Sequence, residues 1–404
     1  MRTTEFKDTE LGPIPKDWEV KRLGECCDTS SGGTPPRSVS DFYNGSIKWF
    51  TTSELRDCYL CDSTEHISQS ALEASSAKIF PSGTLLMAMY GATIGRLGML
   101  TNEAATNQAC CAIFCNDCDV EFLFYYLLHN RARIISLGSG AGQPNISQQI
   151  VKGLQLSLPP LPEQRRIAAA LGDVDKLIEN LKKRVEKKKN LKRGAMQELL
   201  TGKRRLKGFT GAWVEKQLGE TGEFFGGGTP STSISSYWGG EVDWYTPAEI
   251  GEAKYVSASS RRITHEGLKN CAARILPVGT ILLTTRATIG LRAILKHEAA
   301  TNQGFQSLVV KSNFDSEFMY YYLSTIVDEM VSRASGSTFL EISSSKLKGI
   351  RIVVPSSLPE QRAIAAVLSD MDAEIANLEA KLKKMTLLKQ GMMQDLLTGK
   401  VRLV

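Results

Sequence analysis

The chain has 404 residues, of which 42% are hydrophobic and 23% are charged, and its formal net charge is +6. This length is too great for one ordinary hydrophobic core and fits two to four domains, while no apolar run approaches the roughly 20 residues of a membrane span. The first residues lack the apolar stretch of a secretory signal, and the nine cysteines are an odd number, so we expect a soluble, cytoplasmic protein with reduced thiols.

Two copies of one sequence pattern occupy the chain, at an offset of about 195 residues. A repeat of this length predicts a tandem duplication of one globular module followed by one long helix. The matching segments are SGGTP (31–35) and GGGTP (226–230), Trp49 and Trp244, ATIG (92–95 and 287–290), and EAATNQ (103–108 and 298–303). The predicted pieces are 1–159, 160–206, 207–356 and 357–404.

Each module is predicted to be an α+β domain. In the first, the stretches IKWFTT, TLLMAMYGATIG and ACCAIFC are typical of short strands, and the glycines and prolines between them favour turns. Residues 121–130 and 316–326 are predicted to form amphipathic helices, whose aromatic side chains we assign to the core rather than to a ligand stack. The expected fold is therefore α+β, with two tandem modules related by a pseudo-twofold axis.

A long helix is predicted after each module, over 161–201 and 358–398. Both helices begin with LPEQ and end with LLTGK at the same offset of 197 residues, so nothing has been inserted or lost between the two ends. Pro162 and Pro359 stand where the first helical turn tolerates proline, and the glutamate after each suits the positive end of the helix dipole.

The two helices share a heptad pattern of apolar residues. In the second copy the pattern consists of Ile364, Leu368, Met371, Ile375, Leu378, Leu382 and Met385. In the first copy Lys188 takes the last of these positions, and Gly202 and Gly399 are natural C-caps. The pattern favours an antiparallel coiled coil over two unrelated surface helices, each packed on its own module. At ~1.5 Å per residue, a helix of roughly 39 residues would make a spacer of about 58 Å.

Two similar modules at a fixed separation predict a ligand with two similar sites, and B-DNA, whose half-sites recur on one face every ~34 Å, fits this description. The charge pattern agrees in part. Residues 163–207 contain 15 Lys and Arg against 6 Asp and Glu, whereas residues 360–402 contain 7 against 6. The run KKRVEKKKNLKR (182–193) is explained as well by a solvated coiled-coil flank as by contact with phosphates.

The repeated residues resemble a known family. LPEQRRIAAAL and LPEQRAIAAVL with their LLTGK ends, the GGTP–W–ATIG–TNQ series, and DWEVKRLGE and AWVEKQLGE at the module starts are similar to the specificity subunit (S, HsdS) of Type I restriction–modification enzymes. The resemblance covers essentially the full length. It implies a non-catalytic subunit with two target-recognition domains, each reading one half of a split, asymmetric DNA sequence, and a helix pair that sets the spacer.

The resemblance also implies partner subunits. Two adenine-N6 methyltransferase subunits would dock on the helices, and ATP-dependent restriction and translocation subunits would join them. S-adenosylmethionine, ATP and Mg are then expected in the partners and no cofactor in this chain. The residues nominated for docking and for the coiled coil are Pro162, Glu163, Gln164, Leu171, Ile178, Leu181, Pro359, Glu360, Gln361, Leu368, Ile375 and Leu378.

A protein that reads two different half-sites must differ between its copies where it contacts bases. The copies diverge in KWFTTSE against DWYTPAE, in YGATIGR against TRATIGL, and in GAGQPNIS against GSTFLEIS. Asparagine or glutamine can bind adenine through two hydrogen bonds, and arginine can bind guanine. The candidate base-contacting residues, for each of which an ordinary polar loop is the alternative, are Lys48, Thr51, Thr52, Tyr90, Arg96, Gln143, Asn145, Tyr245, Thr246, Arg286, Arg292, Ser337, Thr338 and Glu341.

Two cysteine pairs, Cys58-x-x-Cys61 and Cys115-x-x-Cys118, have the spacing of zinc knuckles. The pairs are separated by far more than the usual ~15–20 residues, and the second copy has no cysteine at the matching positions. From the sequence we therefore expect no metal site.

No catalytic motif is recognisable. Glu19-Val20-Lys21 and Glu379-Ala380-Lys381 have the E-x-K form of metal nucleases, but the first lacks a suitably spaced acidic partner and the second lies on a predicted coiled-coil helix. The four histidines are scattered, and phosphate-binding, H-E-x-x-H and amino-methylation motifs are missing. An enzyme acting alone and a protein–protein scaffold without DNA contact are the alternatives to a DNA-binding adaptor.

Overall fold

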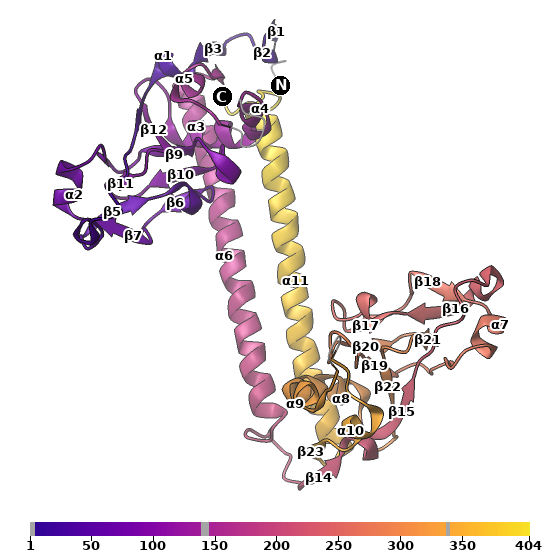
Figure 1. The fold of residues 1–404 in the computed structure, drawn as a ribbon. Coiled ribbons are helices and arrows are strands. Elements are labelled where there is room, and N and C mark those ends of the chain that lie inside the picture. Colours follow the sequence, from indigo (N-terminus) through magenta and orange to yellow (C-terminus); the bar gives the residue numbers. More distant parts are fainter. Residues whose placement is uncertain (1–4, 139–144, 337–339) are drawn as a thin grey trace. The chain divides into compact units, whose positions relative to one another are not determined.

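The computed structural model describes residues 5–138, 145–336 and 340–404 (Figure 1). The chain divides into two compact units, one formed by Met1–Lys182 with Lys381–Val404 and the other by Lys183–Ala380. Each unit therefore contains one module together with a stretch of each long helix. Within the described ranges, no helix combines the length and the apolar character needed to cross a membrane.

The first module contains two small sheets. The larger has the strand order β4-β12-β9-β10-β6, with β9, β10 and β12 side by side in Figure 1, and the smaller has the order β7-β5-β11-β8. The strands are β1 (Phe6–Thr9), β2 (Gly12–Pro15), β3 (Glu19–Arg22), β4 (Cys27–Ser31), β5 (Ile47–Phe50), β6 (Cys58–Leu60), β7 (Glu65–Ile67), β8 (Ile79–Phe80), β9 (Leu85–Ala88), β10 (Leu97–Leu100), β11 (Ala104–Thr106), β12 (Cys110–Cys115) and β13 (Gln155–Leu158). The helices are α1 (Leu23–Cys26), α2 (Gln69–Glu73), α3 (Val120–His129), α4 (Arg131–Ser136) and α5 (Gln148–Lys152), with the 3-10 turns η1 (Ser40–Tyr43), η2 (Thr52–Glu54) and η3 (Gly91–Thr93).

The second module repeats this plan, with a larger sheet of order β15-β22-β19-β20-β17 and a smaller one of order β18-β16-β21. The strands are β14 (Trp213–Gln217), β15 (Gly222–Gly226), β16 (Trp238–Tyr245), β17 (Tyr255–Val256), β18 (Arg261–Ile263), β19 (Ile281–Leu283), β20 (Arg292–Leu295), β21 (Ala300–Thr301), β22 (Gln306–Val310) and β23 (Arg351–Pro355). The helices are α7 (His265–Lys269), α8 (Ser316–Tyr322), α9 (Val327–Arg333) and α10 (Ser344–Lys348), with the 3-10 turns η4 (Leu218–Glu220), η5 (Ser235–Tyr237), η6 (Pro247–Glu249) and η7 (Leu323–Ile326). The predicted α+β duplication is confirmed.

Several of the motifs that the copies share serve as scaffold. A Cβ on Gly32 would stand 2.0 Å from the carbonyl oxygen of Thr106, and one on Gly227 would stand 2.0 Å from the carbonyl oxygen of Asn302, so only glycine fits there. The indole N–H of Trp49 donates to the carbonyl of Gly33 at 3.0 Å, and the second module repeats this bond at 2.9 Å. The aromatic helices also lie in the core, as predicted, since the rings at 122, 125, 126, 318, 321 and 322 are all buried.

The long helices are α6 (Leu161–Leu199) and α11 (Leu358–Leu396), each of 39 residues, and both end two residues before the predicted positions. Gly202 and Gly399 follow with φ angles of 70° and 72°, the left-handed conformation expected of C-cap glycines.

The two helices pair in antiparallel fashion within each unit. In the first unit, Ile167 and Leu171 near the start of α6 share a core with Met393 and Leu396 near the end of α11. In the second unit, Leu199 at the end of α6 shares a core with residues 364, 365 and 368 near the start of α11. The heptad prediction is confirmed, and the alternative in which each helix packs only on its own module is wrong.

A buried glutamate in the first turn of α6 joins three distant segments of the first unit. Glu163 is 2% exposed and accepts hydrogen bonds from Arg402 at 2.7 and 2.8 Å and from the indole N–H of Trp18 at 3.3 Å. Arg402 also binds Asp17 through both terminal nitrogens, at 2.9 and 2.6 Å, and this contact holds the pKa of Asp17 below its usual range. The segment after α11 is thereby fixed to the first module.

The second unit contains the same cluster with the other helix. Glu360 is 1% exposed and accepts hydrogen bonds from Arg205 at 2.6 and 2.8 Å and from the indole of Trp213 at 3.4 Å. Since the arginine follows one helix and the glutamate begins the other, we call each cluster a helix clamp.

A second contact reinforces each clamp further along the helices. The Tyr125 hydroxyl donates to Asp175 of α6 at 2.8 Å, and Lys389 of α11 binds the same carboxylate at 2.7 Å. In the second unit Tyr321 and Lys192 bind Asp372 in the same arrangement.

Replacing Arg205 with alanine should lower the free energy of unfolding of the second unit by about 3 kcal/mol, because Glu360 becomes an uncompensated buried charge. Arg204 provides the matched control, since its side chain is 74% exposed and pairs with an exposed glutamate, so Arg204→Ala should cost less than about 0.5 kcal/mol. Urea unfolding followed by tryptophan fluorescence measures both variants, and equal losses would contradict the helix clamp.

Candidate nucleic-acid interface

The second module has a surface hollow of about 630 Å³ where three loops meet. One loop is the η6 turn, the second is the Arg286–Leu291 turn, and the third follows β21. The first two are stretches in which the sequence copies diverge. They adjoin because β16 and β21 are parallel and paired, with Tyr245 opposite Thr301, so the residues after both strands leave the sheet at one edge.

Arg286 stands on the rim of this hollow beside Glu341. The two residues form an antiparallel bridge, and the guanidinium Nε is 3.8 Å from the Glu341 carboxylate. Both side chains are about half exposed, so their ion pair is weak and the guanidinium can exchange it for another acceptor.

The turn beside Arg286 is strained. Ala287 has a φ angle of 62°, a left-handed conformation that costs a non-glycine residue roughly 1–2 kcal/mol. Its N–H is bound to the carbonyl of Leu340 at 3.1 Å, and the Thr284 hydroxyl accepts from the N–H of Leu291 at 3.0 Å. The surrounding hydrogen bonds thus hold Arg286 in its position on the rim.

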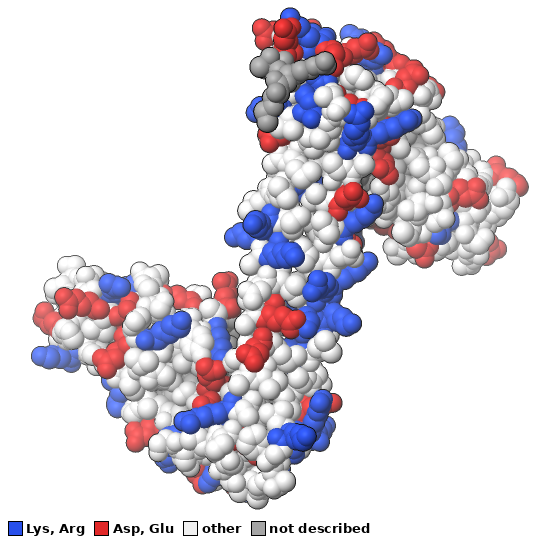
Figure 2. All heavy atoms as spheres, turned by 180° about the vertical axis from the view of Figure 1, so that it is seen from behind, with Lys and Arg blue, Asp and Glu red and all other residues white. Residues whose placement is uncertain are grey.

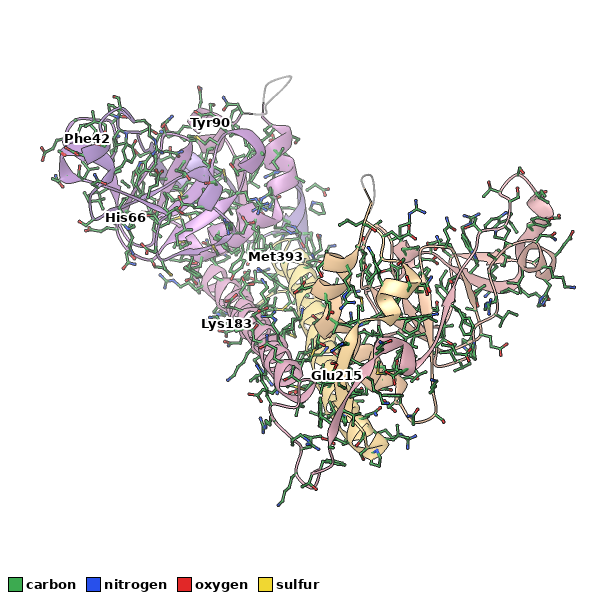
Figure 3. The ribbon with its side chains drawn as sticks, turned by 60° about the horizontal axis from the view of Figure 1, so that its bottom comes forward. Phe42, His66, Tyr90, Lys183, Glu215 and Met393 are labelled. Carbon is green, nitrogen blue, oxygen red and sulfur yellow. The ribbon has the colours of Figure 1, made fainter. Side chains whose placement is uncertain are left out.

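The corresponding edge of the first module brings other candidates together. Tyr90, labelled in Figure 3, is 39% exposed and forms an antiparallel bridge with Asn145, which is also exposed. Arg96 is half-exposed, with its guanidinium 3.7 Å from Asp57. Gln143, Ser337 and Thr338 lie outside the described residues.

The remaining candidates make local contacts. The main-chain N–H groups of Thr51 and Thr246 donate to the glutamates three residues later, both at 2.8 Å, and so cap η2 and η6. The two hydroxyls bind the same carboxylates, at 3.1 and 2.8 Å. Thr52 is a half-buried residue of η2, and Lys48 pairs with Asp62 at 3.7 Å.

Two nominations do not fit the structure. Tyr245 is 2% exposed, and burial raises the pKa of its hydroxyl to about 12, so its ring belongs to the core rather than to a contact surface. Arg292 donates to the carbonyls of Tyr320 at 2.6 Å and of Gly290 at 3.0 Å, and burial lowers its pKa. A sequence comparison of the two copies does not show which way a side chain points.

Most residues nominated for partner docking or for the coiled coil face inward. The Gln164 side chain accepts from the N–H of Asp119 and donates to the carbonyl of Pro159, at 2.9 and 2.8 Å, and Gln361 repeats these bonds in the second unit. The glutamates before them form the helix clamps. The residues buried in the seam between the helices are Leu171, Ile178, Leu181, Leu368 and Ile375, with Leu378 half-buried. Only Pro162 and Pro359 of the twelve nominated residues are exposed.

Lys and Arg side chains gather over the long helices, interspersed with carboxylates (Figure 2). Within the second unit, Lys188 binds Glu374 at 2.6 Å and Lys189 binds Glu379 at 2.7 Å. These pairs explain part of the basic run at 182–193 as the flank of a coiled coil.

Sequence reasoning missed one part of the hollow. Asn302 and Gln303 of the shared TNQ motif line it, as do Ala287 and Thr288 of the shared ATIG motif, although residues that contact bases are expected to differ between the copies. Gln303 does serve the scaffold, since its amide oxygen accepts from Thr229 at 2.6 Å. The parallel pairing of β16 with β21 brings the TNQ residues to the hollow, and no residue pattern in the sequence predicts that pairing.

The chain matches the family model described as the Type I restriction modification DNA specificity domain at residues 15–188 and again at 211–387. It is 27% identical over 425 aligned residues to the putative Type I restriction enzyme MjaX specificity subunit of Methanocaldococcus jannaschii, covering 98% of this chain and 96% of that one. The MjaIX specificity subunit of the same organism is 44% identical over 169 residues, which are 41% of this chain and 39% of the relative.

Solved structures show the same fold. The S subunit of a Type I restriction–modification system from M. genitalium matches with a TM-score of 0.62 at 17% identity, and 98% of each chain is covered. A second match is a structure that describes the basis of complex assembly and conformational transition in the type I R-M system. Its TM-score is 0.58 at 21% identity, over 96% of this chain and 99% of that one.

Replacing Ala287 with glycine should raise the free energy of unfolding by about 1 kcal/mol, because glycine adopts the left-handed conformation without a steric cost. Ala248, in the η6 turn of the same hollow, is the control. Its φ is not left-handed, so Ala248→Gly should destabilise by about 0.5–1 kcal/mol. Chemical unfolding of both variants tests the assignment, and a loss of stability in each would refute the strain.

Proposed function

Because the chain belongs to the family of the Type I restriction modification DNA specificity domain, we propose that it selects the DNA sequence on which partner subunits act, with one half-site read by each module. The chain is a specificity subunit of a Type I restriction–modification system. In such systems the specificity subunit is non-catalytic and the enzymatic activities belong to other subunits.

The observation that carries the proposal of a bipartite site is the contrast between scaffold and rim. The two modules share their sheets and the close glycine contacts, yet the residues at this edge differ, with Arg286 and Glu341 in one module and Tyr90, Arg96 and Asn145 in the other. Two readers with different rims require two different half-sites, so the proposed DNA target is split and asymmetric.

The proposed roles of the long helices are to set the spacer and to bind partners. Two S-adenosylmethionine-dependent methyltransferase subunits would dock on them, and ATP- and Mg-dependent restriction subunits would complete the complex. Leucines at 177, 191, 387 and 388 support this role, because they are each about half exposed along the helices and a partner would cover them.

A methylation map tests the proposed function. The chain is co-expressed with the methyltransferase subunits of its own system in a methylation-free host, and the DNA is sequenced by a method that detects N6-methyladenine. We expect one split motif, methylated on both strands and lost when this chain is omitted. A complex that assembles and binds S-adenosylmethionine but gives no new methylation would favour a scaffold without DNA recognition. Methylation by this chain alone would favour an independent enzyme.

Arg286→Ala in that complex should weaken methylation of the motif by roughly 10-fold or more and relax the base preference at one position of one half-site, since a lost arginine–guanine contact costs about 1–3 kcal/mol. Arg351→Ala is the control, because Arg351 is an exposed arginine of the same module that pairs with Glu215 at 3.1 Å and does not line the hollow. A change in both half-sites, or equal effects of the two variants, would contradict the assignment of Arg286.

A further inference from the structure

Four cysteine side chains meet at one corner of the first module. Cys26 ends α1, Cys27 begins β4, Cys115 ends β12, and Cys118 lies in the turn before α3. The Sγ atom of Cys27 is 3.9 Å from that of Cys26, 3.6 Å from that of Cys115 and 3.5 Å from that of Cys118. The sulfurs of Cys26, Cys27 and Cys118 all lie within 4.8 Å of one another.

The main chain brings these residues together. Cys27 and Cys115 are directly opposite in the antiparallel ladder of β4 and β12. The N–H groups of Asn116 and Asp117 both donate to the carbonyl of Cys26, at 3.0 and 3.3 Å, and so fold the turn that carries Cys118 back over α1. Cys26, Cys27 and Cys118 are buried and Cys115 is half-buried, so the group is screened from water.

The sulfur positions fit a tetrahedral metal better than other thiol chemistry. A zinc ion with four thiolates at ~2.3 Å requires all six sulfur–sulfur separations to be about 3.8 Å. The three distances from Cys27 are close to this value, and Cys26, Cys27 and Cys118 lie close to one another, whereas Cys115 would complete the site by moving its side chain toward them. A disulfide would use only two of the four sulfurs and leave two thiols buried beside it. We propose that Cys26, Cys27, Cys115 and Cys118 form a structural Zn²⁺ site in the first module. Four protein ligands leave no open position, so the ion holds the fold and performs no reaction.

The pairing differs from the one that the cysteine spacing suggested. Cys58 and Cys61 are exposed and lie outside the cluster, whereas the partners of Cys115-x-x-Cys118 come from a Cys-Cys pair at the start of the module. The expectation of no metal site rested on the two C-x-x-C motifs alone, and this proposal replaces it.

The second module closes the same corner without cysteine. Gly222 pairs with Val310 as Cys27 pairs with Cys115, and the N–H of Lys311 donates to the carbonyl of Thr221 at 2.9 Å, as that of Asn116 does to Cys26. Buried Phe314 precedes the N-cap of α8, in the place that Cys118 has before α3. The same corner of the fold is thus packed by a buried phenylalanine in the second module and by a cluster of thiols in the first.

The proposed ion would stabilise the contact between module and long helix. Cys118 precedes Asp119, which caps α3 through its side chain and donates its own N–H to Gln164 of α6. Binding of zinc by Cys118 would fix this residue in the position that the LPEQ contact requires.

Metal analysis of the full chain, purified without chelator in complex with its methyltransferase subunits, tests the site. We expect about one zinc per chain, and at least a roughly 10-fold lower content in a Cys26→Thr/Cys115→Val variant. This variant carries the residues that the second module has at those positions, so it is chosen to fold. Cys58→Ser/Cys61→Ser is the control and should keep its zinc. Zinc retained in the first variant, or lost in the control, would overturn the assignment.

Cobalt substitution of the wild-type complex provides a test that does not depend on a variant. Cobalt held by four thiolates gives intense ligand-field bands and a thiolate charge-transfer band, which support the site. Absence of zinc from a complex in which all nine thiols of this chain react after denaturation, a disulfide among these four cysteines, or iron in place of zinc would each refute the proposal.

Discussion

The structure depends on two buried carboxylates, one at the start of each long helix. Glu163 and Glu360 lie in the first turns of the long helices, with 2% and 1% of their surfaces exposed. Each is paired with an arginine that follows the C-terminal end of the other helix. A buried carboxylate without its partner is costly, so helix length and helix pairing cannot vary independently. This constraint gives a physical reason for the equal offset of 197 residues at both ends of the repeat.

The clamp also changes how the repeat relates to the folded units. In sequence, each copy is a module followed by its own helix. In the structure, the first unit contains the end of α11 and the last residues of the chain, and the second contains the end of α6. Trp18 and Trp213 complete the exchange, because each belongs to a module and contacts the glutamate of one helix and the arginine after the other. Neither copy can form its clamp from its own residues alone.

Duplication leaves the rest of each module free to diverge. Glycines that allow backbone contact and tryptophans that bind them are the same in both copies, while the rims and one structural corner are not. The first module packs one corner with thiols and the second packs the same corner with a phenylalanine. The copies have therefore diverged in buried residues that stabilise the fold as well as in the surface proposed to contact DNA.

The sequence by itself determined the duplication, the α+β modules and the position and seam of both long helices, because these follow from periodicity and spacing that are local along the chain. It also located the divergent loops, two of which line one hollow. Tertiary structure alone decided which side chains face outward. Tyr245 and Arg292 turn inward, and the Gln164 and Gln361 side chains bind main-chain groups. It likewise decided that Cys115 and Cys118 meet Cys26 and Cys27, since strand pairing joins residues almost ninety positions apart and no local pattern records that choice.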